Sequence, residues 1–384
     1  MTRATPVVSY VTALEDLGYS FRLNEAGDTI EVNGKRLDDF ELATIRARMR
    51  AESFSADAVD DIIKMVAAQN RYHPIRSYLI ANGMQWDGRS HILTLAAHFL
   101  DVTTPHRMFE AWLRKWLIGA VAKAMNGWHH QNAMLVLDGP QGIGKSTFAK
   151  WLCSPLPDYY LDDAINPNDK DSHIRLTTHW IWEVGELGAT MRRSDVEALK
   201  AFISRQVVTV RRPYARLDMI KPALASMIGT VNNSAGILAD STGNRRFWVA
   251  TINEIDWNYT NLDPNQVWAE AFTAYTNGEA WYLTPDERAK SEENNEMYRV
   301  PNVVEGYLCK YFYIEPQNHN EWTTTNDIVA RLIDMGYRGV SHRATAMEVA
   351  ATLKEMGVEK SKRRWGGSRP TWGYLGVWPK ATIP

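Results

Sequence analysis

The feature that most constrains the fold is a glycine-rich segment placed directly after a short apolar run. Residues 133–137 read AMLVL, a length and composition typical of a buried parallel strand. Residues 139–147 then read GPQGIGKST, and the pattern at 148–152 predicts the start of a helix. Strand, glycine loop, Lys-Ser pair and helix occur in the order that a phosphate-binding loop requires. This order predicts an α/β fold of the P-loop type, with a parallel sheet flanked by helices.

Each residue type in this loop has a physical role in holding a nucleoside triphosphate. The glycines let backbone amides close around phosphate oxygens, and the N-terminus of the next helix adds partial positive charge. We expect Lys145 to neutralise the phosphates and Ser146 to ligate Mg²⁺. The residues predicted to contact the nucleotide are Gly139, Pro140, Gln141, Gly142, Ile143, Gly144, Lys145, Ser146 and Thr147. The predicted cofactors are therefore ATP and Mg²⁺, and the predicted reaction is hydrolysis of ATP to ADP and phosphate.

A second apolar strand, at 178–187, ends in carboxylates. A strand beside the phosphate loop would bring such acids to the metal and to the attacking water. We expect Glu186, just before the turn at Gly188, to polarise the water and Glu183 to be the acid on the metal side. The assignment between the two stays open, because acids in this role are usually adjacent and one of the pair could be a structural carboxylate.

Two further segments supply polar groups after or before strands. Residues 225–233 read as a buried strand that ends in Asn232, whose amide could hold the lytic water or could cap a turn. Arg245 and Arg246 lie in a turn before the next strand, and their planar guanidinium groups suit stabilisation of a transferring phosphoryl group. They could act in the same subunit or in a neighbouring one. A structural ion pair is the alternative for either arginine.

Residues 207–222 alternate in polarity and turn near 213–214, a pattern typical of a basic hairpin. Arg216 and Lys221 could track a phosphate backbone in a central pore, whereas Arg211 and Arg212 could equally face the nucleotide or a neighbouring carboxylate. A solvated charged loop is the alternative.

A second basic segment lies near the end of the chain, beside Trp365. It contains Lys362, Arg363 and Arg364 without an acid among them. Basic residues interleaved with an aromatic suit a wing that lies on duplex DNA, and a solvated face is again the alternative.

Length and composition limit the function classes. A chain of 384 residues exceeds the size of one hydrophobic core, and its formal charge of −2 means that nucleic acid must be bound through local basic patches. No apolar run approaches the roughly 20 residues that span a bilayer, so we expect no membrane partner. Cys153 and Cys309 are too few for a disulfide framework or a cysteine metal site. With no secretion signal at the start, a cytoplasmic location in a bacterial host is expected.

The pattern of apolar runs divides the chain into five expected regions. These are an N-terminal small α/β domain at 1–69, a helical collar at 70–127, an ATPase core at 128–255, a helical linker at 256–302 and a winged-helix-like domain at 303–384.

The order of these motifs resembles the virulence-associated protein E family, which is found in phages, prophages and mobile islands. The resemblance covers about residues 70–255 and rests on GPQGIGKST, WIWEVGEL, DVEALKAFISRQVVTVRRPYAR, IGTVNN and DSTGNRRFW. The family is similar to superfamily 3 helicases of the AAA+ class. The resemblance implies an AAA+ core that assembles as a ring, usually a hexamer, with ATP between subunits and DNA in the channel.

The resemblance also implies roles for single residues. Lys145 and Ser146 match the first nucleotide motif, Glu186 matches the acid of the second, and Asn232 matches the sensor. Arg245 or Arg246 would match the finger that reaches the adjacent subunit's ATP, and Arg211–Lys221 would match the pre-sensor hairpin.

Two features depart from the wider helicase class. The candidate acids are three residues apart, which leaves the choice of catalytic acid open. No primase motif precedes the core, which argues against a primase-helicase fusion in this polypeptide and leaves a separately encoded primase as a candidate partner.

The function expected from these observations is that of an ATP-dependent, ring-forming DNA helicase or translocase for the replication of a phage or mobile genetic element. The alternative is a regulatory or helicase-loading ATPase that acts on a host replication or defence protein without unwinding DNA. A small-molecule P-loop kinase is a third possibility, which the arginine pair and the basic hairpin disfavour.

Overall fold

The computed structural model describes residues 6–102, 107–128, 130–185, 187, 193–211, 217–232, 244–298, 302–364 and 370–381. The chain divides into two compact units. One is formed by Met1–Ser234 with Gly243–Met297, and the other by Ala235–Thr242 with Tyr298–Pro384.

The first unit begins with a small α/β region whose helices cover a sheet of strand order β3-β2-β1-β4. Its elements are α1 (Val7–Asp16), β1 (Phe21–Asn24), β2 (Thr29–Val32), β3 (Lys35–Arg36), α2 (Asp39–Ala51), α3 (Ala56–Gln69) and β4 (Arg71–Tyr72). Phe21, Ile45 and Ile63 belong to an apolar cluster of this region. The Asp38 side chain accepts a hydrogen bond from the Glu41 amide and so fixes the start of α2.

The larger part of the first unit is built on a sheet of strand order β5-β12-β6-β11-β8-β7. The strands are β5 (Phe99–Asp101), β6 (Met134–Asp138), β7 (Tyr160–Asp162), β8 (Ile181–Val184), β11 (Ser226–Val231) and β12 (Phe247–Ile255). Within this sheet β5 pairs antiparallel with β12, and the other pairs are parallel. The structure thus confirms a mixed α/β fold with a largely parallel sheet.

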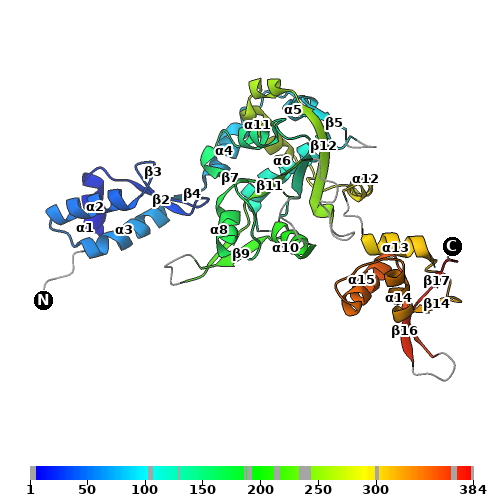
Figure 1. Ribbon diagram of the computed structural model, residues 1–384. Coiled ribbons are helices and arrows are strands. Elements are labelled where there is room, and N and C mark those ends of the chain that lie inside the picture. Colours follow the sequence, from blue (N-terminus) through cyan, green and yellow to red (C-terminus); the bar gives the residue numbers. More distant parts are fainter. Residues whose placement is uncertain are drawn as a thin grey trace. The chain divides into compact units, whose positions relative to one another are not determined.

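Helices flank this sheet. They are α4 (Pro74–Gly83), α5 (His91–Ala97), α6 (Phe109–Asn126), α7 (Lys145–Leu152), α8 (Lys170–Thr178), α10 (Arg193–Ile203), α11 (Pro264–Thr276) and α12 (Pro285–Glu296), with short 3-10 turns η1 (Pro157–Tyr159), η2 (Asn244–Arg246) and η3 (Trp257–Asn261). In Figure 1, α4, α5, α6 and α11 gather beside the sheet, and they contact one another while α6 contacts β6 and β11.

Burial explains why the strands read as continuous apolar runs. Every residue of β6, β8 and β11 is buried, as expected when both faces of a parallel sheet are covered. The indoles of Trp180 and Trp268 pack with their ring centroids 4.2 Å apart in the same core. Because the strands are parallel, their carboxyl ends lie at one edge of the sheet, and the loops that follow them meet there.

The expected hairpin is present as β9 (Val207–Val210) and β10 (Met219–Pro222), which pair antiparallel. Its turn, with Arg212 and Arg216, lies outside the described residues. Lys221, expected to face a central pore or to lie on a solvated loop, lies instead against the N-terminal region. Its Nζ donates hydrogen bonds to the main-chain oxygens of Glu25 at 2.7 Å and Ala26 at 3.3 Å, because β10 lies against the N-terminal region.

In its described residues, the second unit has three helices, a sheet of strand order β14-β16-β15 and a β13-β17 pair. Its elements are α13 (Val303–Tyr311), β13 (Phe312–Ile314), β14 (Trp322–Thr324), α14 (Thr325–Asp334), α15 (His342–Glu355), β15 (Lys360–Arg363), β16 (Thr371–Leu375) and β17 (Val377–Pro379). In the described part of the chain, no helix combines the length and the apolar character that a membrane crossing needs.

Lys123 on α6 is a buried lysine beneath the sheet. Its side chain is 3% exposed, and its ammonium group donates a hydrogen bond to the main-chain oxygen of Ala225. Loss of hydration on burial lowers the pKa of Lys123 from 10.5 to about 7. Below pH 7 the buried ammonium group is charged and lowers the free energy of unfolding. As the pH rises above 7, the group loses its proton in the folded state and this destabilisation decreases.

We predict that Lys123 contributes an increase in the free energy of unfolding between about pH 7 and pH 10. In this window the unfolded chain holds a proton on Lys123 that the folded chain has released, which contributes up to ~1.4 kcal/mol per pH unit. Lys123→Met should remove this contribution, whereas Lys150→Met, on the exposed face of α7, should keep it. Urea unfolding of the three proteins across this range measures the slopes. Equal slopes for the wild type and Lys123→Met would contradict the prediction.

Candidate functional site

The glycine loop that follows β6 has a backbone only glycine adopts readily. Gly139, Gly142 and Gly144 have φ angles of +158°, +83° and +106°. A Cβ atom at Gly139 would lie 2.0 Å from the main-chain oxygen of Ile252 on β12, so this glycine also permits close packing of the loop on the sheet. Gly144 is the N-cap of α7. The loop is therefore built into the fold at the amino end of a helix.

The Lys145 side chain lies inside this loop. It is 6% exposed, and its Nζ donates to the main-chain oxygens of Gly139 and Pro140, each at 2.7 Å, and to Oδ1 of Asn232 at 3.1 Å. Burial lowers the pKa of Lys145, and the charge of Asp138 opposes this shift. Three acceptors match the three donors of an ammonium group. A ligand anion at Lys145 would therefore replace one or more of these oxygens.

Asn232 reaches Lys145 because β11 is the neighbour of β6. Val231, the last residue of β11, pairs with Asp138, the last residue of β6. The segments that follow the two strands therefore leave the sheet side by side, at its carboxyl edge. The Asn232 amide therefore lies beside the glycine loop, in contact with Lys145.

Glu183 on β8 lies at the same edge and is 1% exposed. The Tyr160 hydroxyl donates a hydrogen bond to its Oε2 atom. Burial raises the pKa of Glu183, while the hydrogen bonds with Ser146 and Tyr160 lower it. The two residues that the sequence assigns to the metal therefore lie close enough for Ser146 to affect the pKa of Glu183. Sequence reasoning missed Tyr160, because nothing local links it to an acid 23 positions away.

The Ser146 and Glu183 oxygens fit a nucleotide-bound magnesium ion. Mg²⁺ that accompanies a nucleotide keeps waters and phosphate oxygens as ligands and needs only one or two protein oxygens. Such a site does not require a cluster of acids. Among the described residues, no cluster of three or more His, Cys, Asp or Glu side chains could hold a metal ion. Glu186, the candidate for polarising water, lies outside the described residues.

Arg245 and Arg246 lie at the opposite edge of the sheet. They end η2, directly before β12, whose first residue Phe247 pairs with Met134 at the start of β6. The glycine loop follows the other end of β6, and four strand residues alone span about 13 Å. The two arginines therefore lie too far from the glycine loop of their own subunit to act on a phosphate bound there.

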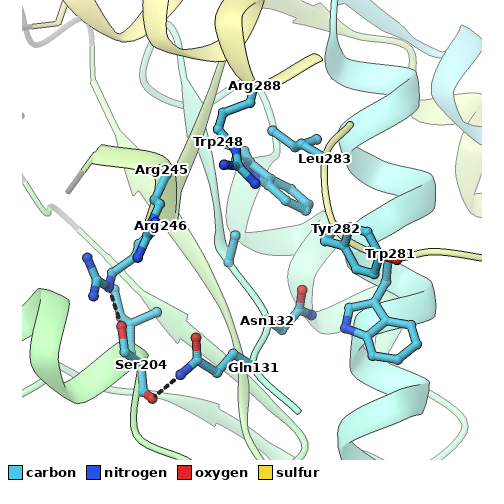
Figure 2. Close-up of a pocket in the computed structure, with 12 residues that line it drawn as sticks. Gln131, Asn132, Ser204, Arg245, Arg246, Trp248, Trp281, Tyr282, Leu283 and Arg288 are labelled. Carbon is cyan, nitrogen blue, oxygen red and sulfur yellow. Dashed lines mark hydrogen bonds between the residues drawn. The ribbon is translucent and has the colours of Figure 1, made fainter. Parts of the chain in front are cut away.

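These two arginines line a cavity of about 260 Å³. Figure 2 shows Arg245, Arg246 and Arg288 on its walls together with the indoles of Trp248 and Trp281. Arg246 Nε donates to the Ser204 hydroxyl, whereas no carboxylate in the described part of the chain pairs with Arg245 or Arg288. Sequence reasoning missed Arg288, because it is one of two basic residues in the acidic helix α12 and nothing in the sequence marks it as facing the cavity.

The candidate DNA-binding residues lie in separate regions. Arg211 is exposed at the end of β9, and Arg212 and Arg216 are not among the described residues. In the second unit, the Lys362 ammonium group lies 5.6 Å from the ring centroid of Trp372, and Arg363 donates to the main-chain oxygen of His319 at 3.0 Å.

Arg364 follows β15 as an exposed residue, so the basic segment lies on the surface of its unit. Trp365 beside it is outside the described residues.

We predict that Gly139→Ala destabilises the protein more than Gly142→Ala. The added Cβ at Gly139 meets a main-chain oxygen of the sheet, whereas at Gly142 it meets no atom within 4 Å and costs only left-handed strain of about 1 kcal/mol. Thermal unfolding of the two variants measures the difference. Equal midpoints would show that the loop can move away from β12 without cost.

Comparison with known proteins gives one family by sequence and similarity to solved structures. No curated protein matches the chain. The A form apo structure of the NrS-1 C-terminal region shares 12% identity at a TM-score of 0.48, covering 97% of this chain and 100% of that one. The apo structure of NrS-1 C-terminal region 305–718 shares 12% identity at 0.49, with coverages of 98% and 100%.

The family is identified by sequence. The profile of the virulence-associated protein E-like domain matches residues 81–300, from α4 to beyond α12, which is more than half of the chain. This range includes the glycine loop, Glu183, Asn232 and the arginine cavity. The chain belongs to the virulence-associated protein E-like family.

Proposed function

We propose that this protein is an ATP-driven, ring-forming DNA helicase or translocase that serves the replication of a phage or mobile genetic element. One observation carries the proposal: Lys145, Ser146, Glu183 and Asn232, from three neighbouring strands and the loops after them, meet at one edge of the sheet. Such a meeting of ammonium, hydroxyl, carboxylate and amide groups suits the terminal phosphates of ATP.

The strand order supports the assignment of the core to AAA+ P-loop ATPases. β11 lies between β6, which carries the glycine loop, and β8, which carries Glu183. This order places the Asn232 amide between the phosphate-binding residues and the acid. An amide in that position can hold a water molecule against the terminal phosphate.

The residues of the loop would act in sequence on ATP. The backbone amides of the glycine loop hold the phosphate oxygens, and Lys145 exchanges its carbonyl partners for them. Ser146 and Glu183 hold Mg²⁺, which when bound offsets phosphate charge. Asn232 positions the attacking water, and we assign its polarisation to Glu186.

The arginine cavity supports a ring, most simply a hexamer. If the amino edge of one subunit's sheet faces the glycine loop of the next, guanidinium groups reach a phosphate that they cannot reach within one chain. Arg245 is exposed and Arg246 is half-buried and bound to Ser204. We therefore assign the reaching role to Arg245 and a positioning role to Arg246.

DNA contacts are assigned to two basic segments. Arg211, Arg212 and Arg216 belong to the β9–β10 hairpin, which would project into the central channel. The second unit has the helix-and-sheet composition of a winged-helix module, with a basic wing strand β15. Contacts of both kinds are to phosphate, so binding should weaken as salt rises.

One observation favours the alternative of a non-unwinding, loading or regulatory ATPase. The Lys221 ammonium group is held by two main-chain oxygens of the N-terminal region and is not presented to a channel. In this alternative the hairpin acts on a host replication or defence protein. A separately encoded primase or other replication protein remains a proposed partner of either activity.

We predict that Lys145→Ala lowers ATP turnover by at least about a hundredfold, the usual effect of removing one group that stabilises developing charge. Lys150→Ala, an exposed lysine of the same helix α7, should leave turnover unchanged. Release of phosphate with and without DNA measures both. Wild-type turnover by Lys145→Ala would contradict the proposed site.

The same preparations separate the two candidate functions on a forked DNA substrate. A helicase displaces one strand in an ATP-dependent way that Lys145→Ala abolishes. DNA-stimulated hydrolysis without strand displacement would instead support the loading ATPase.

We predict that Arg245→Ala loses turnover while still binding ATP, because its own glycine loop is intact. Mixing it with Lys145→Ala should restore part of the activity, since some interfaces then combine an intact loop with an intact arginine. Each variant alone is the control. Absence of recovery in stable mixed oligomers would rule out action between subunits.

A further inference from the structure

Trp257 is a half-exposed tryptophan that the proposed hydrolysis does not use. It begins η3, directly after β12, and is 50% exposed. The indoles of Trp112, Trp116 and Trp268 in the same unit are fully buried. A half-exposed tryptophan leaves a large apolar surface in contact with water, which is unfavourable. Because this one lies beside a candidate ligand site, the bound ligand could cover that surface.

The Trp257 ring packs on the glycine loop itself. A Cβ atom at Gly144 would lie 2.9 Å from Cζ2 and 3.1 Å from Cη2 of Trp257. Gly144 directly precedes Lys145, so the six-membered part of the indole lies next to the residues that would hold the phosphates. The loop can bring the ring this close only because residue 144 has no side chain.

Trp257 flanks the loop on the side opposite to the hydrolytic residues. β12 is one neighbour of β6 in the sheet, and β11 followed by β8 lies on the other side. Asn232 and Glu183 come from that other side, where the terminal phosphate would be held. A triphosphate fixed there at one end extends its nucleoside toward the β12 side, where the exposed indole lies.

The segment that carries Trp257 is fixed by hydrogen bonds. The Asp256 side chain accepts from the Asn258 amide at 3.0 Å and contacts Nδ1 of His98 at 2.8 Å. Tyr259, two residues further on, is fully buried in the main core. A ring held in place before the ligand arrives loses little conformational freedom on binding.

We propose that Trp257 is the base platform of the nucleotide site, and that its exposed indole face stacks on the purine ring of the bound nucleotide. The inference rests on the proposed function, because it requires a nucleoside triphosphate in the glycine loop. Stacking uses the π-face that every base has, so Trp257 favours nucleotides over a bare phosphate chain and larger purines over pyrimidines.

Equilibrium titrations with Mg-ATP and with Mg-tripolyphosphate, which lacks the nucleoside, test the proposal. Trp257→Ala should weaken ATP binding about tenfold or more, the usual loss on removing a stacking aromatic, and leave tripolyphosphate binding unchanged. Trp257→Phe keeps an aromatic face and should retain most of the ATP affinity. Trp128→Ala, which removes a tryptophan of 44% exposure between α6 and β6, is the matched control and should bind both ligands as the wild type does.

Three outcomes would overturn the proposal. Unchanged ATP affinity in Trp257→Ala would show that the ring does not contact the base. Equal losses for ATP and tripolyphosphate would show that Trp257 only supports the loop. If the wild type bound neither ligand, the proposed function itself would fail together with this inference, a result distinct from the other two.

Discussion

The structure of the candidate site depends on where one buried ammonium group finds its hydrogen-bond acceptors. Lys145 is buried at the start of α7, and its three donors point to two oxygens of its own loop and to the Asn232 amide. A buried charge without such partners would be costly, so these bonds hold the loop in a closed shape before any ligand binds. The ammonium group of Lys145 is thus already oriented in the free protein, and a bound phosphate would replace one or more of its present acceptors.

The parallel sheet turns this local arrangement into a site with two ends. Strands β6, β8 and β11 deliver Lys145, Glu183 and Asn232 to the carboxyl edge, and β12 begins with the arginine cavity at the amino edge. One strand therefore carries Arg245 before it and Trp257 after it. If the amino edge of one subunit's sheet faces the carboxyl edge of the next, every interface combines the phosphate-binding residues of one subunit with Arg245 of the other. An isolated chain cannot bring these groups together.

The sequence predicts the local parts of this arrangement well, because they depend on short-range patterns. The strand before Gly139 and the helix beginning at Lys145 follow from an apolar run and a glycine loop, and the hairpin at 207–222 follows from alternation. The parts that could not be predicted depend on contacts distant in sequence. Tyr160 meets Glu183, and Lys221 meets a main-chain oxygen 196 positions earlier. Periodicity carries no information about such pairings.

The most direct test of the account is a structure of the protein with Mg²⁺ and a non-hydrolysable ATP analogue. We expect the terminal phosphate within hydrogen-bond distance of Lys145 Nζ, with that atom moved away from the oxygens of Gly139 and Pro140. Nucleotide bound elsewhere, or an unliganded loop with Lys145 still on its carbonyl partners at saturating analogue, would contradict it.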